Sequence, residues 1–239
     1  MVPVRDEAEN VRPLVVELYA ALGKALDFEL IFVDDGSRDR TVEELRTLSR
    51  EFPRLHVLRL RQAYGQSAAI FTGARKARGE WIATLDGDGQ NDPGDIQVLL
   101  KARDAQVPQP VMVVGWRRRR EDPWLKRAAS RVANTACRWF LNDPSPDVGC
   151  GLKLFRRDAF LALPYFDHMH RFLPALVLAC GGTVISVEVR HRPRRGGRSK
   201  YGIRDRLWVG IVDLFGVRWL QKRIKYPVIE AEEEGGPPA

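Results

Sequence analysis

The chain has 239 residues, of which 44% are hydrophobic and 29% are charged. This balance fits one folded domain of moderate size and argues against a largely disordered chain. Lysine and arginine total 39 against 31 acidic residues, and the net charge of +8 favours anionic partners such as phosphorylated ligands, nucleic acid or an anionic membrane surface. The three cysteines contain no CxxC pair, which argues against a disulfide framework or a structural zinc site and suits the cytoplasm.

The first half of the chain alternates short apolar runs with helical patterns. Runs of strand length occur at 30–33, 56–60, 81–85 and 111–114. Before the first of these runs lies a helical apolar face formed by Val11, Leu14, Val15, Leu18 and Leu22. This alternation predicts an α/β fold with a mostly parallel, Rossmann-like sheet flanked by helices. Ligands bind such sheets beyond the carboxyl ends of the strands, so the residues after each strand are the candidates for chemistry.

The second half of the chain is less regular. It predicts a helix over 126–141, strands over 151–155 and 183–189, and a C-terminal amphipathic helix over 204–225 flanked by lysine and arginine. Its longest apolar stretch, 207–220, is shorter than the ~20 residues that cross a bilayer and contains Asp213 and Arg218, so we expect no span there. Such a helix either packs on its own core or lies in a membrane interface, and with Trp208, Trp219 and the flanking lysine and arginine we expect the second. The expected divisions are a 1–200 domain with a truncated first strand, a 201–225 interfacial helix and a disordered 226–239 tail.

Three acidic clusters each follow a predicted strand. They are Asp6-Glu7, Asp34-Asp35-Gly36-Ser37 and Asp86-Gly87-Asp88-Gly89-Gln90. A parallel sheet would gather all three at one edge, where concentrated negative charge is costly unless a cation compensates it. A divalent metal shared with substrate phosphates is the usual solution. Each turn alone could be only a turn or a helix cap, but three on one edge favour a metal- and phosphate-binding cleft.

Taken in order, these motifs resemble those of family 2 glycosyltransferases of the GT-A fold. Within that family the chain is most similar to the dolichol-phosphate mannose synthase and polyprenyl-phosphate sugar transferase branch, and the resemblance covers roughly residues 2–220. The features that indicate this branch are Gly65-Gln66 with Gly73, Gly115-Trp116-Arg117, the segment 130–134 and the segment 194–201.

The resemblance implies a role for each matching position. For the nucleotide-sugar it implies Pro3, Val4, Glu7, Asp34, Asp35, Gln66 and Asp86. For catalysis it implies Asp86, Asp88 and Arg117, with Asp88 and Gln90 as ligands of Mg²⁺ or Mn²⁺. For the acceptor phosphate it implies Arg117, Arg131, Arg194, Ser199 and Lys200. Arg5 departs from the pattern, since many relatives carry an aromatic residue there, and this leaves recognition of the base open.

The implied function is metal-dependent, inverting transfer of a hexose from a nucleotide-sugar, of the GDP-mannose or UDP-glucose type, to undecaprenyl or dolichyl phosphate. The chemistry is coherent because a phosphate monoester, with a second pKa near ~6, is mostly dianionic at neutral pH and needs little help from a base. The protein must mainly bring two anions together and neutralise the departing diphosphate. We expect a cytoplasmic protein, peripheral on the inner face of the membrane, with a membrane-protein partner as one option.

Three alternatives compete with this interpretation. The same donor site could serve a soluble or polysaccharide acceptor, but the basic 194–201 segment argues against it. A non-catalytic nucleotide-sugar-binding protein conflicts with the intact Asp35, Asp86, Asp88 and Gln90. A nucleic-acid-binding module fits the net charge but not a carboxylate-lined edge, which would repel phosphates unless a metal were present. His168-Met169-His170 has a spacing close to that of metal ligands, but no further His or Cys stands nearby in the sequence, which favours a partly buried or rim position over a metal site.

Overall fold

The computed structural model describes residues 1–239 except 24–25, 119–134, 136–137, 194–202 and 226–239. Within these residues the strands are β1 (Val2–Val4), β2 (Leu30–Asp34), β3 (Leu55–Arg59), β4 (Trp81–Thr84), β5 (Met112–Trp116), β6 (Lys153–Arg156) and β7 (Val184–Glu188). The helices are α1 (Ala8–Leu22), α2 (Thr41–Glu51), α3 (Gln66–Lys76), α4 (Asp95–Asp104), α6 (Arg157–Ala162), the 3-10 helix η1 (Met169–Arg171), α7 (Leu173–Ala179) and α8 (Ile203–Arg223).

The strands form one mostly parallel layer. β1, β2 and β3 pair in parallel, and the remaining strands follow the order β4-β6-β5-β7, with β6 antiparallel to both of its neighbours. Met1 N donates to Ala83 O (2.7 Å) and Leu85 N donates to Met1 O (3.3 Å), the pattern of a parallel pair between β1 and β4. The three-stranded sheet β1-β2-β3 and the four-stranded sheet β4-β6-β5-β7 are thus joined at the edges formed by β1 and β4, and the predicted α/β fold is confirmed.

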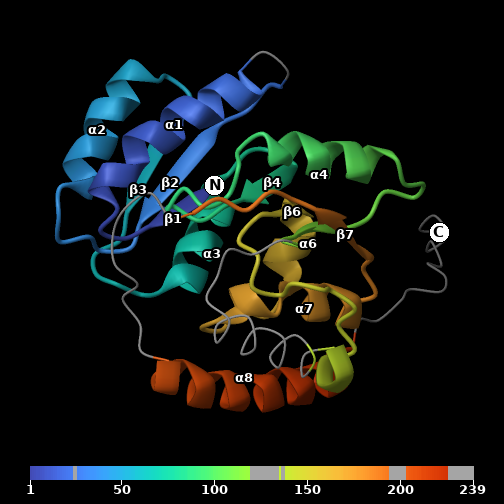
Figure 1. The fold of residues 1–239 in the computed structure, drawn as a ribbon. Coiled ribbons are helices and arrows are strands. Elements are labelled where there is room, and N and C mark those ends of the chain that lie inside the picture. Colours follow the sequence, from blue (N-terminus) through green and yellow to red (C-terminus); the bar gives the residue numbers. More distant parts are fainter. Residues whose placement is uncertain (24–25, 119–134, 136–137, 194–202, 226–239) are drawn as a thin grey trace, which may run out of the picture.

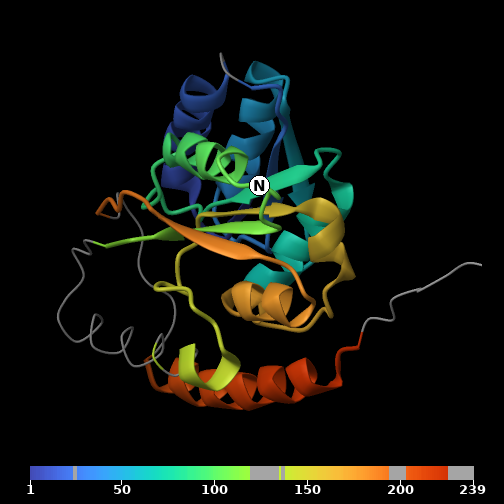
Figure 2. The ribbon, with the colours of Figure 1, turned by 90° about the vertical axis from the view of Figure 1, so that its right-hand side faces the viewer.

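Helices cover both faces of this sheet (Figures 1 and 2). Along β2, Leu30 and Phe32 pack into the core under α1, α2 and α4, whereas Ile31 and Val33 pack with α3, α6 and α7. Successive strand residues point to opposite faces, so a strand covered on both sides must be apolar throughout. This is why the sequence shows continuous apolar runs rather than alternating ones.

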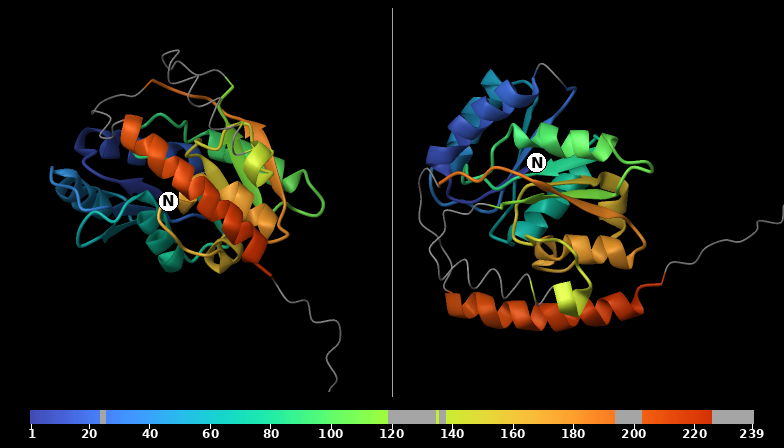
Figure 3. Two further views of the ribbon diagram at one scale, coloured as in Figure 1. Left: turned by 90° about the horizontal axis from the view of Figure 1, so that it is seen from below. Right: turned by 45° about the vertical axis from the view of Figure 1, so that its right-hand side comes forward.

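The helix α8 lies at the outer boundary of this core, below α7 in Figure 1 and across it when seen from below in Figure 3. Its Val217 is buried, and Gln221 Nε2 donates to Leu141 O (2.9 Å) and Ala175 O (3.2 Å). The amphipathic helix predicted over 204–225 is therefore present and docks on its own domain through one side. Among the described residues, no helix is both long enough and apolar enough to cross a membrane.

Candidate active site

The turns that follow β1 and β2 are fastened to each other. Ser37 Oγ accepts a hydrogen bond from Asp6 N (2.8 Å), and Asp6 Oδ1 accepts one from Arg38 N (2.6 Å). Thr41 Oγ1, at the start of α2, accepts a hydrogen bond from Glu7 N (2.8 Å). Buried backbone donors need such partners, so these side chains hold the two turns side by side at the carboxyl edge of the sheet.

The two aspartates at the end of β2 lie in different environments. Asp34 is fully buried with its carboxylate oxygens 3.3 Å from Ser37 N, so it supports the turn from inside. Asp35 accepts hydrogen bonds from Tyr64 N (2.6 Å) and Gly65 N (2.9 Å), immediately before α3. Backbone donors at a helix N-terminus stabilise an anion, so Asp35 ties the end of β2 to the start of α3.

The turn at 86–90 follows β4 and packs on β1. A Cβ atom on Gly87 would lie 2.6 Å from Val4 Cγ1, so only glycine allows this close approach. Within the turn, Gln90 N donates to Asp88 Oδ1 (3.1 Å). The acidic turn therefore has a defined shape and lies directly beside the end of the first strand.

The carboxylate of Asp86 is enclosed by groups from distant parts of the chain. Gln66 Nε2, from the first residue of α3, donates to Asp86 Oδ1 (3.0 Å). Gly151, on the approach to β6, lies so close to this carboxylate that a Cβ atom there would collide with it. Burial, and then the charge of Asp88, raise the pKa of Asp86, while Lys153 acts in the opposite direction. Two carboxylates that repel each other in a buried setting are suited to binding a cation.

Two buried basic side chains lie close to this acidic turn. Arg117, directly after β5, donates Nε to Asp147 Oδ2 (2.7 Å) and Nη2 to Asp147 Oδ1 (3.1 Å). This bidentate pair is nearly enclosed, with side-chain exposures of 13% for Arg117 and 2% for Asp147. Lys153, the first residue of β6, donates its amine to Cys150 O, and burial lowers its pKa. The site thus combines carboxylates with fixed positive charge, the mixture that a metal–diphosphate ligand requires.

The segment that leaves β7 returns to the acidic turn. Arg192 N donates to Gln90 O (3.0 Å), and the Arg192 guanidinium pairs with Asp92 (2.7 Å). Arg190 N and Nε both donate to the carboxylate of Asp95 at the start of α4 (2.6 and 3.0 Å). These contacts fasten the chain beside the 86–90 turn just before residue 194, where the acceptor-binding residues are predicted to begin.

The predicted site residues fall into two groups. Those at the carboxyl edge of the sheet or at the start of α3 are Pro3, Val4, Glu7, Asp34, Asp35, Gln66, Asp86, Asp88, Gln90 and Arg117. Those outside the described residues are Arg131, Arg194, Ser199 and Lys200. Within the first group, Glu7 Oε2 accepts a hydrogen bond from Asn10 Nδ2 (2.6 Å), so its carboxylate also holds the first turn of α1. The ligand contacts assigned to these residues stay predictions.

Sequence reasoning missed the residues that β6 and its preceding loop bring to the site. These are Asp147, Gly151 and Lys153. Two signals could have found them: a lysine at the start of the apolar run 152–155, and the small residues 149–151 before it. A charged residue in a strand buried on both faces needs a polar partner, so Lys153 should have indicated nearby carboxylates.

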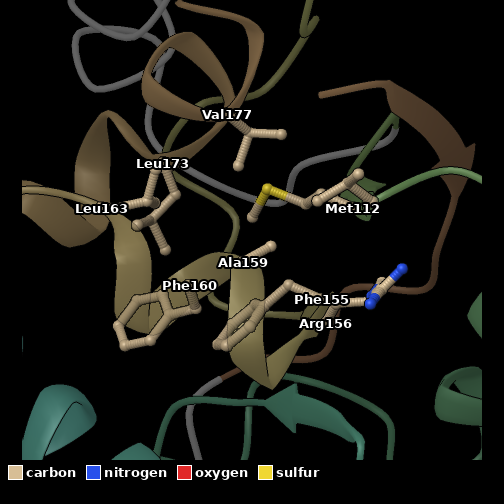
Figure 4. A pocket seen from close by; sticks show the side chains of 9 residues that line it. Met112, Phe155, Arg156, Ala159, Phe160, Leu163, Leu173 and Val177 are labelled. Atoms are coloured by element: carbon tan, nitrogen blue, oxygen red, sulfur yellow. The ribbon is translucent and has the colours of Figure 1, made fainter. Parts of the chain in front are cut away.

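An apolar pocket lies at the other end of β5 and β6 (Figure 4). Its lining includes Met112, Phe155, Phe160, Leu173 and Val177. Met112 pairs with Phe155 at that end, whereas Val114 pairs with Lys153 at the acidic end. An apolar hollow without carboxylates does not suit a nucleotide-sugar, so the candidate active site is the acidic edge and not this pocket.

Solved structures with the same architecture identify the fold. Mannosyl-3-phosphoglycerate synthase from Rubrobacter xylanophilus matches with a TM-score of 0.71 over 99% of this chain and 77% of that chain, at 19% identity. Glucosyl-3-phosphoglycerate synthase from Mycobacterium tuberculosis, in complex with Mn²⁺, uridine diphosphate and phosphoglyceric acid, matches with a TM-score of 0.70 over 94% and 78%, at 14% identity. The chain has the fold of the GT-A glycosyltransferases, as the motifs predicted.

Sequence similarity then identifies the family. Residues 1–163 match the profile of Glycosyl transferase family 2, and the chain belongs to that family. It is 36% identical over 227 residues to dodecaprenyl-phosphate galacturonate synthase from Rhizobium johnstonii, covering 93% of this chain and 66% of the relative. It is 34% identical over 208 residues to undecaprenyl-phosphate 4-deoxy-4-formamido-L-arabinose transferase from Edwardsiella ictaluri, covering 85% and 62%. Both relatives are named as sugar transferases of polyprenyl phosphates, the branch that the motifs resemble, and the chain spans slightly less than two thirds of the length of each.

Proposed function

We propose that this protein transfers a sugar from a nucleotide-sugar to a polyprenyl phosphate, with a divalent metal ion and with inversion at the anomeric carbon. The observation that carries the proposal is the convergence of Asp35, Asp86 and Asp88 at one sheet edge, beside the buried Arg117. The named activities of the two relatives, both on polyprenyl phosphates, support the acceptor class.

The acidic turn fits a divalent cation such as Mg²⁺ or Mn²⁺. Asp86 and Asp88 lie close enough for the charge of one to raise the pKa of the other, and a dication would relieve this repulsion. The described part of the chain holds no preassembled group of three His, Cys, Asp or Glu side chains for a metal. Magnesium-like ions at phosphate sites commonly use one or two carboxylates and complete their coordination with phosphate oxygens and water. Asp88 and Gln90 would hold the ion, which would withdraw negative charge from the leaving diphosphate.

The residues of the chain would bind and orient the two substrates. Asp35, Gln66 and Asp86 line the start of α3 and would face the donor. An oxygen of the acceptor phosphate attacks the anomeric carbon, and the bond from that carbon to the diphosphate oxygen breaks, so the nucleoside diphosphate leaves with the electron pair. Arg117, held in place by Asp147, would supply positive charge as the two anions approach each other.

The outer side of α8 would meet the membrane that carries the acceptor. Val212, Phe215 and Trp219 lie along this side with exposures of 56%, 60% and 59%, opposite the buried Val217. Trp139, in the helical residues beside α8, is 83% exposed. Large apolar side chains rarely stand this exposed on a water-facing surface, and at this spacing they form a stripe along the helix.

The charges around this stripe favour an anionic lipid surface. Arg218, Lys222 and Arg223 flank it, and the Arg223 guanidinium lies 5.8 Å from the centre of the Trp219 ring. Asp213 is 17% exposed in its side chain and is turned toward His168, with 3.0 Å between its Oδ2 and His168 Nδ1. Aromatic residues bordered by cations are typical of helices that lie in a membrane interface.

A radiolabelled transfer assay tests the proposal. Labelled GDP-mannose, UDP-glucose and UDP-galacturonate are each offered with undecaprenyl phosphate in detergent, with Mn²⁺, Mg²⁺ or EDTA. Metal-dependent label in the organic phase, lost in Asp88→Asn, is the expected result. Transfer that persists in EDTA would overturn the metal assignment. Nucleotide-sugar binding without a lipid product, combined with label on a soluble acceptor, would favour the soluble-acceptor alternative.

A further inference from the structure

Two histidines in one short turn contact two different helices. His168, whose φ is +64°, lies just before η1 and pairs with Asp213 of α8. His170, inside η1, has its Nδ1 2.8 Å from Ser67 Oγ in the first turn of α3. Ser67 is 1% exposed, so this second contact is enclosed by protein. Ser67 and His170 are separated by 103 residues in the sequence. Neither residue has a role in the candidate active site described above.

The hydrogen bonds around Ser67 suit one tautomer of the His170 ring. Ser67 Oγ accepts a hydrogen bond from His170 N (3.2 Å), and in this tautomer its hydroxyl proton is donated to Nδ1 (2.8 Å). Nδ1 is then the acceptor, and the ring proton is on Nε2. Burial, followed by the charge of Lys153, lowers the pKa of His170 to about 3, so the ring is neutral near pH 7 and can keep accepting this bond.

The first turn of α3 is the element that this buried pair holds in place. Gln66, adjacent to Ser67, donates its amide to Asp86 (3.0 Å). Gly65, with φ of +94°, donates its N–H to Asp35 (2.9 Å). The turn therefore has anchors on two acidic residues of the donor side, and His170 provides a third anchor from the second half of the chain.

We infer that His170 is a positioning residue for the donor site, which acts through Ser67 to hold the amide of Gln66 against the carboxylate of Asp86. The inference rests on the proposed function, because it assumes that Gln66 and Asp86 contact the nucleotide-sugar. Without the histidine acceptor, the Ser67 hydroxyl would turn to another partner and the start of α3 would lose one of its three anchors. A helix end that shifts by even a fraction of an ångström misplaces a group that must fit a ligand closely.

Two substitutions of His170 separate positioning from simple packing. His170→Phe keeps a ring of similar size but offers no acceptor, whereas the Oδ1 of His170→Asn can accept the serine proton. We expect His170→Phe to raise the Kd for UDP or GDP, whichever the wild type binds with Mn²⁺, by about ten-fold. We expect His170→Asn to stay within about three-fold of the wild type. The KM for the nucleotide-sugar should rise in parallel in His170→Phe, with a smaller change in kcat.

The variant Ser67→Ala keeps the test decisive if His170→Phe does not fold. It removes the other half of the hydrogen bond, leaves the ring in place and introduces a good helix former. It should weaken nucleotide binding at least as much as His170→Phe does. The double variant should be no worse than Ser67→Ala alone, because Ser67→Ala already removes both hydrogen bonds between the serine hydroxyl and residue 170. His168→Asn is the matched control, since it alters the neighbouring histidine and its α8 contact but should leave nucleotide affinity unchanged.

The outcomes distinguish this inference from the proposed function. A wild-type protein that binds neither nucleotide with Mn²⁺ would contradict the proposed function itself. A wild type that binds, with His170→Phe and Ser67→Ala binding equally well and only their Tm lowered, would overturn the inference alone. Equal losses of affinity in His170→Asn and His170→Phe would also overturn it, because an acceptor would then make no difference.

Discussion

The backbone of Gly151 lies directly against the carboxylate of Asp86. Thr84 Oγ1, two residues before Asp86, donates to Gly151 O (3.0 Å) and so draws the two segments together. The contact exists because β6 runs antiparallel to β4 and its approach passes the end of that strand. A residue without a side chain is therefore part of the wall of the candidate active site.

Gly151→Ala should damage the site while leaving the fold intact. The added Cβ atom would collide with the Asp86 carboxylate and push it away from Gln66. We expect transfer activity to fall by at least about 100-fold, because a displaced reactive-site group is poorly tolerated. Gly216→Ala is the control: nothing lies within 4 Å of its Cβ position, so activity measured in detergent should not change. Normal activity of Gly151→Ala would show that Asp86 does not need its present position.

Asp88→Asn should abolish metal-dependent transfer. The amide keeps the shape of the side chain and an oxygen that can accept the hydrogen bond from Gln90 N, but it loses the negative charge that a hard cation requires. We expect turnover to fall on the order of 100-fold or more, with an unchanged circular dichroism spectrum. Titration with Mn²⁺ checks the cause directly, and metal affinity equal to that of the wild type would remove Asp88 from the metal site.

The pair of Arg117 and Asp147 should contribute strongly to stability. Removing one partner of a buried ion pair leaves an uncompensated charge, so Asp147→Ala should lower the free energy of unfolding by ~3–5 kcal/mol. Arg118 and Glu188 form an exposed comparison pair, 3.6 Å apart with side-chain exposures of 66% and 54%. Glu188→Gln should change the free energy of unfolding by less than about 1 kcal/mol. Urea unfolding measures the free energy of unfolding of both variants. Equal changes in Asp147→Ala and Glu188→Gln would show that Arg117 is exposed to solvent in solution.

Acidification should destabilise the protein through His170. Its pKa is lowered from 6.5 to about 3 in the folded state, so between these values the unfolded chain binds more protons. Stability is therefore fully present above pH 6.5 and declines as the pH falls toward 3. We expect the loss of Tm between pH 7.5 and pH 5 to be smaller in His170→Asn, which has no titrating ring. An equal loss in both proteins would mean that other groups cause the acid sensitivity.

Membrane binding should depend on the outer side of α8. Replacing Phe215 and Trp219 together by serine should reduce sedimentation with vesicles containing anionic lipid by about ten-fold or more, because both side chains would lose their burial in the interface. Val16→Ser is the control, since Val16 is 48% exposed on α1, a different helix. Nucleotide affinity should be the same in all three proteins. Undiminished vesicle binding of the Phe215 and Trp219 variant would place the lipid contact elsewhere.

Much of the fold and the acidic motifs of the candidate site could be predicted from local sequence patterns. Apolar runs at 30–33 and 81–85 predicted buried strands, and the acidic residues after them, such as Asp35 and Asp86, had to gather because parallel strands end at a common edge. The amphipathic period of 204–225 likewise predicted α8. Each of these features depends only on residues that are close in the chain.

The tertiary structure alone decided which distant groups complete the site. Gly151 and Lys153 reach Asp86 because β6 inserts in antiparallel orientation between β4 and β5, and His170 reaches Ser67 across 103 residues. Which side of α8 faces outward was decided in the same way, by the packing of Val217 and Gln221. Periodicity is set by neighbouring residues, whereas strand order and the contacts between remote turns follow from how the whole core packs. A single sequence therefore predicts the acidic motifs but not the residues, such as Gly151 and Lys153, that β6 brings against them.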